Sequence, residues 1–182
     1  MRDTYAVTRR TPTHSSETRA NCADIVCASF RQDGGSLARF DHEVKLFIAE
    51  PLSNLADALF AHLAADPPGR LMVPDLFFIE CANILWKHVR RFGYPVVKAR
   101  SDLRNLEKLA LQRIPTVSLM TDALDIAVAQ VVSAYDACYV ALAYRLGIPF
   151  VTADDKLAHM LANTPYAVFL LGDFPIPPLP SP

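Results

Sequence analysis

The stretch Tyr135–His159, YDACYVALAYRLGIPFVTADDKLAH, constrains the fold of this chain more than any other part of its sequence. It predicts a helix that ends at Gly147, a short apolar strand and the start of a second helix. The helix from Asp136 to Leu146 advances about 16 Å at roughly 1.5 Å per residue, and the strand IPFVT returns about 16 Å at roughly 3.3 Å per residue. A helix that runs back along the following strand over the same length is typical of an α/β fold.

Helical and strand patterns alternate along most of the remaining chain. Apolar residues at helical spacing predict further helices at 52–66, 74–93, 94–112 and 122–134, and Ser53 is the expected N-cap of the first. Short apolar runs predict strands at 70–74, 114–119 and 166–174. The alternation predicts a three-layer α/β/α sandwich with a mainly parallel sheet, in which the N-terminal strand is atypical or missing.

The pattern changes at both ends of the chain. Residues 1–36 are polar and irregular apart from the apolar run DIVCASF at Asp24–Phe30, and two glycines at 34 and 35 follow. The end, FPIPPLPSP, is rich in proline and is expected to be extended. We therefore expect an atypical N-terminal segment at 1–36, one domain at 37–174 and a proline-rich tail at 175–182.

Composition limits the classes of function. The four cysteines show no spacing typical of a disulfide framework, so a reducing, cytoplasmic compartment is expected. No run approaches the roughly 18 to 20 apolar residues of a membrane span, so no membrane association is expected. The net charge of −1 gives no overall sign of nucleic-acid binding, which would have to come from local patches.

Asp136 and Asp154 are expected to meet at one edge of the sheet. Asp136 stands at the start of its helix, and Asp154 lies just beyond the C-terminal end of the following strand. Because the two elements have equal length, both residues fall at the carboxyl edge, where open α/β sheets bind their ligands. Each aspartate taken alone is equally consistent with a helix cap.

Glu80 is the third acid of interest, because it lies among apolar residues in the predicted helix 74–93. The residues three and four positions away are Leu76, Phe77, Asn83 and Ile84. A carboxylate on such a face is costly to bury unless something pairs with it, and the nearest base on its helix is Lys87, two turns away. A surface position for Glu80 is the alternative.

Carboxylates that converge on one point repel each other unless a cation lies between them. Oxygen ligands with retained waters select Mg²⁺ or Mn²⁺ rather than zinc. Such an ion activates a water and binds a phosphate oxygen. Glu80, Asp136 and Asp154 are therefore candidate metal ligands for phosphodiester hydrolysis.

The segments VPDLFFIECANIL, SAYDACYVALAYRLGIPFVTADDKLAH and VFLLGDF resemble the PIN-domain ribonucleases, and most closely the VapC-type toxins of bacterial toxin–antitoxin pairs. The likeness covers about Val44 to Phe174 and includes KLFIAEP at Lys45–Pro51. The resemblance implies an endoribonuclease in which four acids bind Mg²⁺ or Mn²⁺ and activate water to cut RNA. It also implies a homodimer and a cognate antitoxin protein as partners.

By motif match, the resemblance assigns catalytic and metal-binding roles to Glu80, Asp136 and Asp154 as the second, third and fourth acids. It further implies supporting roles for Thr152, just before the fourth acid, and for Asn83, one helical turn after Glu80.

The first acid of the family is not at its expected place. That position, six residues before Lys45, holds Arg39, and the preceding GGSLA is not an apolar strand. Asp41 is a candidate replacement as a catalytic acid. A shift of two residues in a helix, however, turns a side chain by about 200°, so Asp41 serves only if the local backbone differs.

Three accounts of this departure are open. In the first, which the abrupt loss of likeness at Glu43–Val44 favours, the N-terminal residues are out of frame or start from a wrong codon. In the second, DIVCASF replaces the first strand and Asp33 or Asp41 supplies the acid. In the third, catalysis has been lost, and the chain is an inactive PIN-like module that binds an antitoxin or RNA.

Basic residues near the end of the helix 74–93 are candidates for RNA binding: Lys87, Arg90 and Arg91. Basic residues in a last helical turn also complement the helix dipole, and that structural role is the alternative. A more distant rival function is a doubly wound phosphate-transfer protein in which Asp154 is phosphorylated, but no acidic pair at the end of a first strand is legible.

Overall fold

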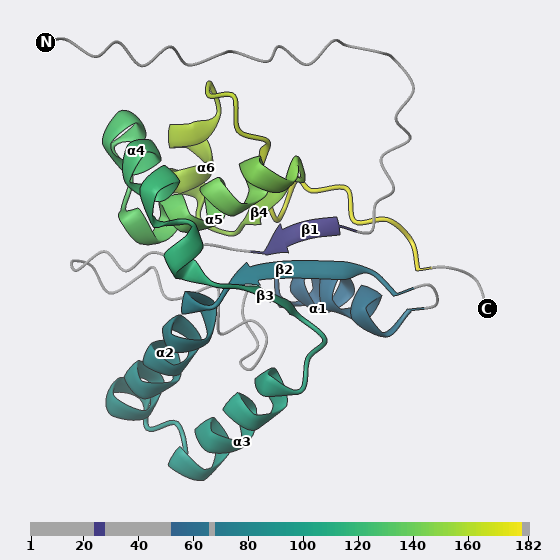
Figure 1. Cartoon of the computed structure of the whole chain (residues 1–182). Coiled ribbons are helices and arrows are strands. Elements are labelled where there is room, and N and C mark those ends of the chain that lie inside the picture. Colours follow the sequence, from purple (N-terminus) through teal and green to yellow (C-terminus); the bar gives the residue numbers. More distant parts are fainter. Residues whose placement is uncertain (1–23, 28–51, 66–67, 180–182) are drawn as a thin grey trace, which may run out of the picture.

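The computed structural model describes residues 24–27, 52–65 and 68–179 of the 182-residue chain (Figure 1). Within these residues a five-stranded parallel sheet has the order β3-β2-β1-β4-β5. The strands are β1 (Asp24–Cys27), β2 (Arg70–Pro74), β3 (Gln112–Ile114), β4 (Phe150–Thr152) and β5 (Val168–Leu170). The strand order reverses direction between β1 and β4, which places the topological switch point at the carboxyl ends of these two strands.

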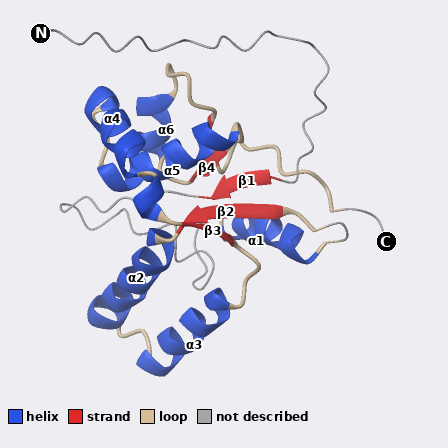
Figure 2. Cartoon of the chain, viewed as in Figure 1, coloured by secondary structure: helices blue, strands red, loops and turns tan. Residues whose placement is uncertain are grey.

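Helices lie to both sides of the strands (Figures 1 and 2). On one side are α1 (Ser53–Ala61), α2 (Leu76–Phe92) and α3 (Val96–Glu107); on the other are α4 (Met120–Gln130), α5 (Ala134–Leu146) and α6 (Asp155–Leu161). Two short 3₁₀ turns, η2 (His62–Ala64) and η3 (Thr116–Ser118), complete the described elements. The arrangement confirms the predicted α/β sandwich with a parallel sheet.

Helix α5 is the central helix of the core. Every residue from Asp136 to Ala143 is buried, and the helix packs against β1, β2 and β4. Gly147 ends α5 in the left-handed conformation, with φ of 67°, as the sequence predicted. Because α5 packs against three strands and against α4, it is a rigid support for the acid in its first turn.

Helices α2 and α3 form a hairpin that extends away from the sheet (Figure 1). Gly93, with φ of 67°, ends α2, and Pro95 precedes the first turn of α3. Tyr94 donates a 2.6 Å hydrogen bond to the buried Asp102 of α3, and Lys98 contacts both residues. This polar cluster fixes the turn between the two helices.

The structure adds a strand and corrects two expectations from the sequence. The N-terminal segment supplies an atypical first strand, since Asp24–Cys27 forms β1 between β2 and β4, as the second account of the N-terminus expects. The strand predicted at 114–119 is wrong, because β3 ends at Ile114 and residues 116–118 form η3. Ser53 is not an N-cap, since it is the first residue of α1 and Leu52 holds the cap position without a side-chain hydrogen bond.

Within the described part of the chain, no single helix is long and apolar enough to cross a membrane. The consecutive helices α4 and α5 meet the length and hydropathy criteria only when taken together, and they are bent by 113° at their junction.

Candidate functional site

Glu80 is held by a tyrosine from the central helix. It lies in the second turn of α2 and is partly buried, and the Tyr139 hydroxyl donates a hydrogen bond to its Oε2 atom. The ring of Tyr139 is fully buried and stacks against Phe150 of β4, with ring centroids 6.1 Å apart. The position of the Glu80 carboxyl group is therefore set by α5 and β4 as well as by α2.

The surroundings of Glu80 favour its neutral form. The pKa of Glu80 is raised from 4.5 to about 7, chiefly by burial, and the nearby charge of Asp136 acts in the same direction. The hydrogen bond from Tyr139 acts in the opposite sense and lowers this pKa. Glu80 thus exchanges its proton near neutral pH, and a cation that bound the pair would compete with that proton.

Asp136 occupies the first turn of α5 but does not cap the helix. The cap is Ser133, whose Oγ accepts a hydrogen bond from the Asp136 backbone N–H at 3.1 Å. The same hydroxyl donates to Asp136 Oδ2 at 2.6 Å. The cap alternative for Asp136 is therefore wrong. The residue is a carboxylate that is only 2% exposed, at the positive end of a buried helix.

Asp154 does cap a helix. Its Oδ1 accepts a 2.9 Å hydrogen bond from the backbone N–H of Leu157, in the first turn of α6. The fully buried Thr152, at the end of β4, accepts a 3.0 Å hydrogen bond from the Asp154 N–H through its Oγ1. A carboxylate accepts through two oxygens, so a cap made by Oδ1 leaves Asp154 chemically able to bind a cation through Oδ2.

The structure brings Glu80 and Asp136 together but does not assemble the full acid set. Over residues 24–27, 52–65 and 68–179, no group of three His, Cys, Asp or Glu side chains is close enough to hold a metal ion. Asp154 thus lies at the same edge of the sheet without joining the Glu80–Asp136 pair. Asp41, the candidate for the first acid, lies outside the described residues, as do Asp33 and Arg39.

The pair formed by Glu80 and Asp136 has the donor chemistry that a divalent cation requires. Both ligands are carboxylates, which Mg²⁺ and Mn²⁺ prefer, and both are withdrawn from bulk water. The pKa of Glu80 is raised chiefly by burial and in part by the charge of Asp136, so the charged form of Glu80 is disfavoured in the absence of a cation. Glu80 and Asp136 are therefore suited to provide two of the ligands of a divalent cation, and other groups provide the rest.

The remaining candidates differ in their exposure. Asn83 is exposed on α2, one turn beyond Glu80. Asp155 is exposed, and its Oδ1 atom lies 3.3 Å from His159 Nδ1. Of the proposed RNA-binding residues, Lys87 is buried, whereas Arg90 and Arg91 are exposed.

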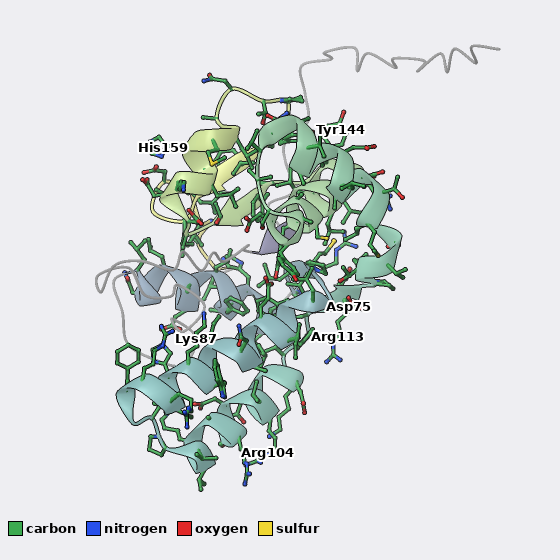
Figure 3. All side chains as sticks on the ribbon, turned by 90° about the vertical axis from the view of Figure 1, so that its left-hand side faces the viewer. Asp75, Lys87, Arg104, Arg113, Tyr144 and His159 are labelled. Carbon is green, nitrogen blue, oxygen red and sulfur yellow. The ribbon has the colours of Figure 1, made fainter. Side chains whose placement is uncertain are left out.

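Sequence reasoning missed two residues that position the acids. Tyr139 lies three residues after Asp136 and so shares its helix face. This spacing could have been recognised from the sequence. Asp75 lies between β2 and α2, and it accepts hydrogen bonds from the backbone N–H of Thr116, at 2.8 Å, and from its hydroxyl. These bonds lower the pKa of Asp75 and join the start of α2 to the segment after β3, near the Asp75 label in Figure 3.

Comparison with known proteins gives a consistent result. The sequence model of the PIN domain matches residues 44–161. Ribonuclease VapC3 of Pyrobaculum aerophilum is 34% identical over 115 residues, which cover 62% of this chain and 84% of that protein. Ribonuclease VapC9 of Mycobacterium tuberculosis is 38% identical over 89 residues, which cover 49% of this chain and 68% of that protein.

A solved structure shares the fold. The crystal structure of PAE2754 from Pyrobaculum aerophilum matches with a TM-score of 0.54 and 22% sequence identity, and covers 83% of this chain and 85% of that chain. At this level of identity the likeness concerns the fold alone.

Proposed function

Because this chain belongs to the PIN-domain family and is of the VapC type, we propose that it is an endoribonuclease that acts as the toxin of a toxin–antitoxin pair. The reaction is hydrolysis of RNA phosphodiester bonds, with Mg²⁺ or Mn²⁺ as cofactor. The observation that carries this proposal is the contact between two elements at the candidate site, where Tyr139 holds Glu80 beside Asp136.

Each acid has a distinct part in the proposal. Glu80 and Asp136 bind the cation directly, since they are adjacent and shielded from water. Asp154 caps α6 at the same edge of the sheet and, in this proposal, reaches the cation through its second oxygen only once the cation is bound. Thr152 fixes the backbone of Asp154, and Asn83 contributes a polar group one turn along α2. When bound, the cation supplies charge neutralisation and a water of lowered pKa.

The first acid comes from the segment between β1 and α1 in this proposal. Strand β1 ends at Cys27 beside β4, at the topological switch point of the sheet. Asp41 remains the proposed catalytic residue of that segment. The proposed domain comprises residues 37–174, with 1–36 as an atypical N-terminal segment that contributes β1 and 175–182 as the proline-rich tail.

The proposed partners follow from the same family. They are an RNA substrate, a cognate antitoxin protein and a second copy of the chain in a homodimer. The proposed RNA-binding residues are the exposed Arg90 and Arg91 and the buried Lys87. The proposed compartment is the cytoplasm. It agrees with Cys138, which is a buried free thiol.

An inactive PIN-like binding module is the second candidate function. Two observations favour it: Arg39 stands at the expected place of the first acid, and the described residues hold no three-acid group. Such a module would keep contact with RNA or antitoxin but would not hydrolyse RNA.

Cleavage of single-stranded RNA by the purified chain, with Mg²⁺ or Mn²⁺ and with EDTA, separates these functions. We expect cleavage that EDTA and Asp136→Asn abolish and that Asp155→Asn, a neighbouring charge change outside the site, leaves unchanged. No cleavage by the natural chain, together with cleavage by an Arg39→Asp variant, would show that only the first acid is lacking. No cleavage by either chain, with the fold intact, would support the binding module.

A further inference from the structure

One face of α2 carries an exposed row of side chains that begins beside Glu80. Its members, Ile79, Asn83, Trp86 and Arg90, are spaced by four, three and four residues, so they share one side of the helix. Ile79 is 69% exposed and Trp86 57% exposed, and the other two are also exposed. We call these four residues the α2 row.

The exposed tryptophan is the unusual member of this row. Trp86 is the only tryptophan of the chain, and its large apolar ring lies mostly in solvent on a helix whose other face is buried. Trp rings left in water are typical of binding surfaces. The exposed Arg90 lies one turn further along the same face of the helix.

The charge of the surrounding hairpin selects an anionic partner. Over residues 76–108 lysine and arginine outnumber aspartate and glutamate, whereas over 109–179 the acids outnumber the bases. The exposed bases of the hairpin are Arg90, Arg91, Lys98, Arg100, Arg104 and Lys108. Figure 3 shows Arg104, in the last turn of α3, projecting outward from the hairpin. The net charge of −1 therefore conceals a basic hairpin on an otherwise acidic body.

We propose that the α2 row is a binding site for single-stranded RNA, in which a base stacks on Trp86 and Arg90 contacts a phosphate. A basic surface that carries an exposed aromatic ring is the arrangement by which proteins hold single strands without reading their sequence. The proposal rests on the proposed ribonuclease function, because it assigns to the row the part of the substrate next to the cleaved bond.

The dimensions of the helix agree with this assignment. Trp86 lies six residues beyond Glu80, about 9 Å along the axis, and Arg90 lies about 15 Å away at 1.5 Å per residue. At about 3.4 Å per stacked nucleotide, that distance spans roughly four nucleotides. A strand held at its scissile phosphate by the acid pair can thus follow the row to the end of α2.

Intrinsic fluorescence reports this binding directly, because the chain has a single tryptophan. The full chain in EDTA, which prevents cleavage, is titrated with a short oligouridylate. We expect quenching of Trp86 that saturates with RNA. The Trp86→Leu variant, followed by anisotropy of a labelled RNA, is expected to bind about tenfold more weakly, whereas Trp86→Phe keeps most of the affinity because it keeps an aromatic face.

Matched controls exist on the same hairpin. Phe92 is 56% exposed and lies about 240° around α2 from Trp86, so Phe92→Leu is expected to leave RNA binding unchanged. Arg90→Gln is expected to weaken binding and to lower the slope of log affinity against log salt by about 0.7, the value for one phosphate contact to a single strand. Arg104→Gln, the same charge change on α3, is expected to have a smaller effect.

RNA cleavage by the same preparations separates this inference from the proposed function. Cleavage by the natural chain with no quenching, and with full affinity in Trp86→Leu, would overturn the α2 row while leaving the ribonuclease intact. Quenching without cleavage would support the row and refute the ribonuclease. Fluorescence that shifts with protein concentration in the absence of RNA, together with RNA affinity unaffected in Trp86→Leu, would identify the row as a protein-docking surface and overturn the proposal.

Discussion

The hydroxyl of Tyr139 donates a hydrogen bond to Glu80 and thereby joins the buried helix α5 to α2. Asp136 lies one turn before Tyr139 on α5, so a single rigid helix supplies one acid and orients the other. The relative positions of the two carboxyl groups consequently depend on the packing of α5 against the sheet and not on a mobile loop. A site of this kind is preorganised for a cation.

Replacement of Tyr139 by phenylalanine tests this link. The hydrogen bond lowers the pKa of Glu80, so its loss raises that pKa further and disfavours the carboxylate. We expect a loss of about 1 to 3 kcal/mol in the free energy of unfolding near pH 8, and a smaller loss near pH 5.5, where Glu80 is protonated. Urea unfolding at the two pH values measures it. Tyr144→Phe, an exposed tyrosine of the same helix, is the control, and an equal loss at both pH values would contradict the link.

Glu80→Gln is expected to change how stability depends on pH. The folded-state pKa of Glu80 is raised from 4.5 to about 7, so the unfolded chain releases this proton first. Its contribution to stability is fully present below pH 4.5 and is lost as the pH rises through about 7. In EDTA, we expect the free energy of unfolding of the variant, relative to that of the natural chain, to increase by up to about 3 kcal/mol between pH 4.5 and about pH 7. A difference in the free energy of unfolding that stays constant from pH 4.5 to pH 8 would contradict this account.

Asp154 combines two roles that substitutions can separate. Serine also caps helices but cannot serve as a carboxylate ligand, whereas alanine does neither. We expect Asp154→Ser to keep the melting temperature and lose RNA cleavage, and Asp154→Ala to lose cleavage and about 1 kcal/mol of stability. Asp155→Asn, one residue on and exposed, is expected to retain both. Full activity in Asp154→Ser would mean that this residue is only a cap.

Ser133→Ala is expected to damage both the helix and the acid it serves. The substitution removes the cap of α5 and the 2.6 Å hydrogen bond to Asp136 Oδ2. We expect a loss of about 1 to 2 kcal/mol in stability and weaker metal-dependent cleavage. Ser133→Thr, which keeps the hydroxyl, should restore both in chemical denaturation and cleavage assays. If Ser133→Ala cleaved RNA as fast as the natural chain, Asp136 would need no support from this hydroxyl.

The part of the fold that could be predicted from the sequence is the part that local rules determine. Helix α5, its end at Gly147 and the strand that follows all carry strong local signals, and the structure confirms each. Asp154 was likewise recognised as a cap candidate from its place after a strand. These features depend on residues within a few positions of each other.

Features that depend on distant contacts were predicted less well. The strand expected after Ile114 gives way to η3 because the Thr116 N–H is bonded to the Asp75 side chain and not to a neighbouring strand. Strand β1 has only four residues, and the apolar run that contains it left open whether it replaces the first strand of the family, so its place in the centre of the sheet is established by its pairing with β2 and β4. The Tyr139–Glu80 contact joins residues 59 positions apart, beyond any local pattern.

Binding of Mn²⁺ is the measurement that tests the central claim most directly, because it asks whether the Glu80–Asp136 pair is a cation site without relying on any substrate. The purified chain is titrated with Mn²⁺ near pH 8 by calorimetry or by loss of the free-ion electron paramagnetic resonance signal, beside Asp136→Asn and Asp155→Asn. We predict saturable binding that is lost in Asp136→Asn, kept in Asp155→Asn and weakened near pH 5.5, where protonated Glu80 resists the cation. Binding that is equal in all three chains, or absent from the natural one, would contradict the account.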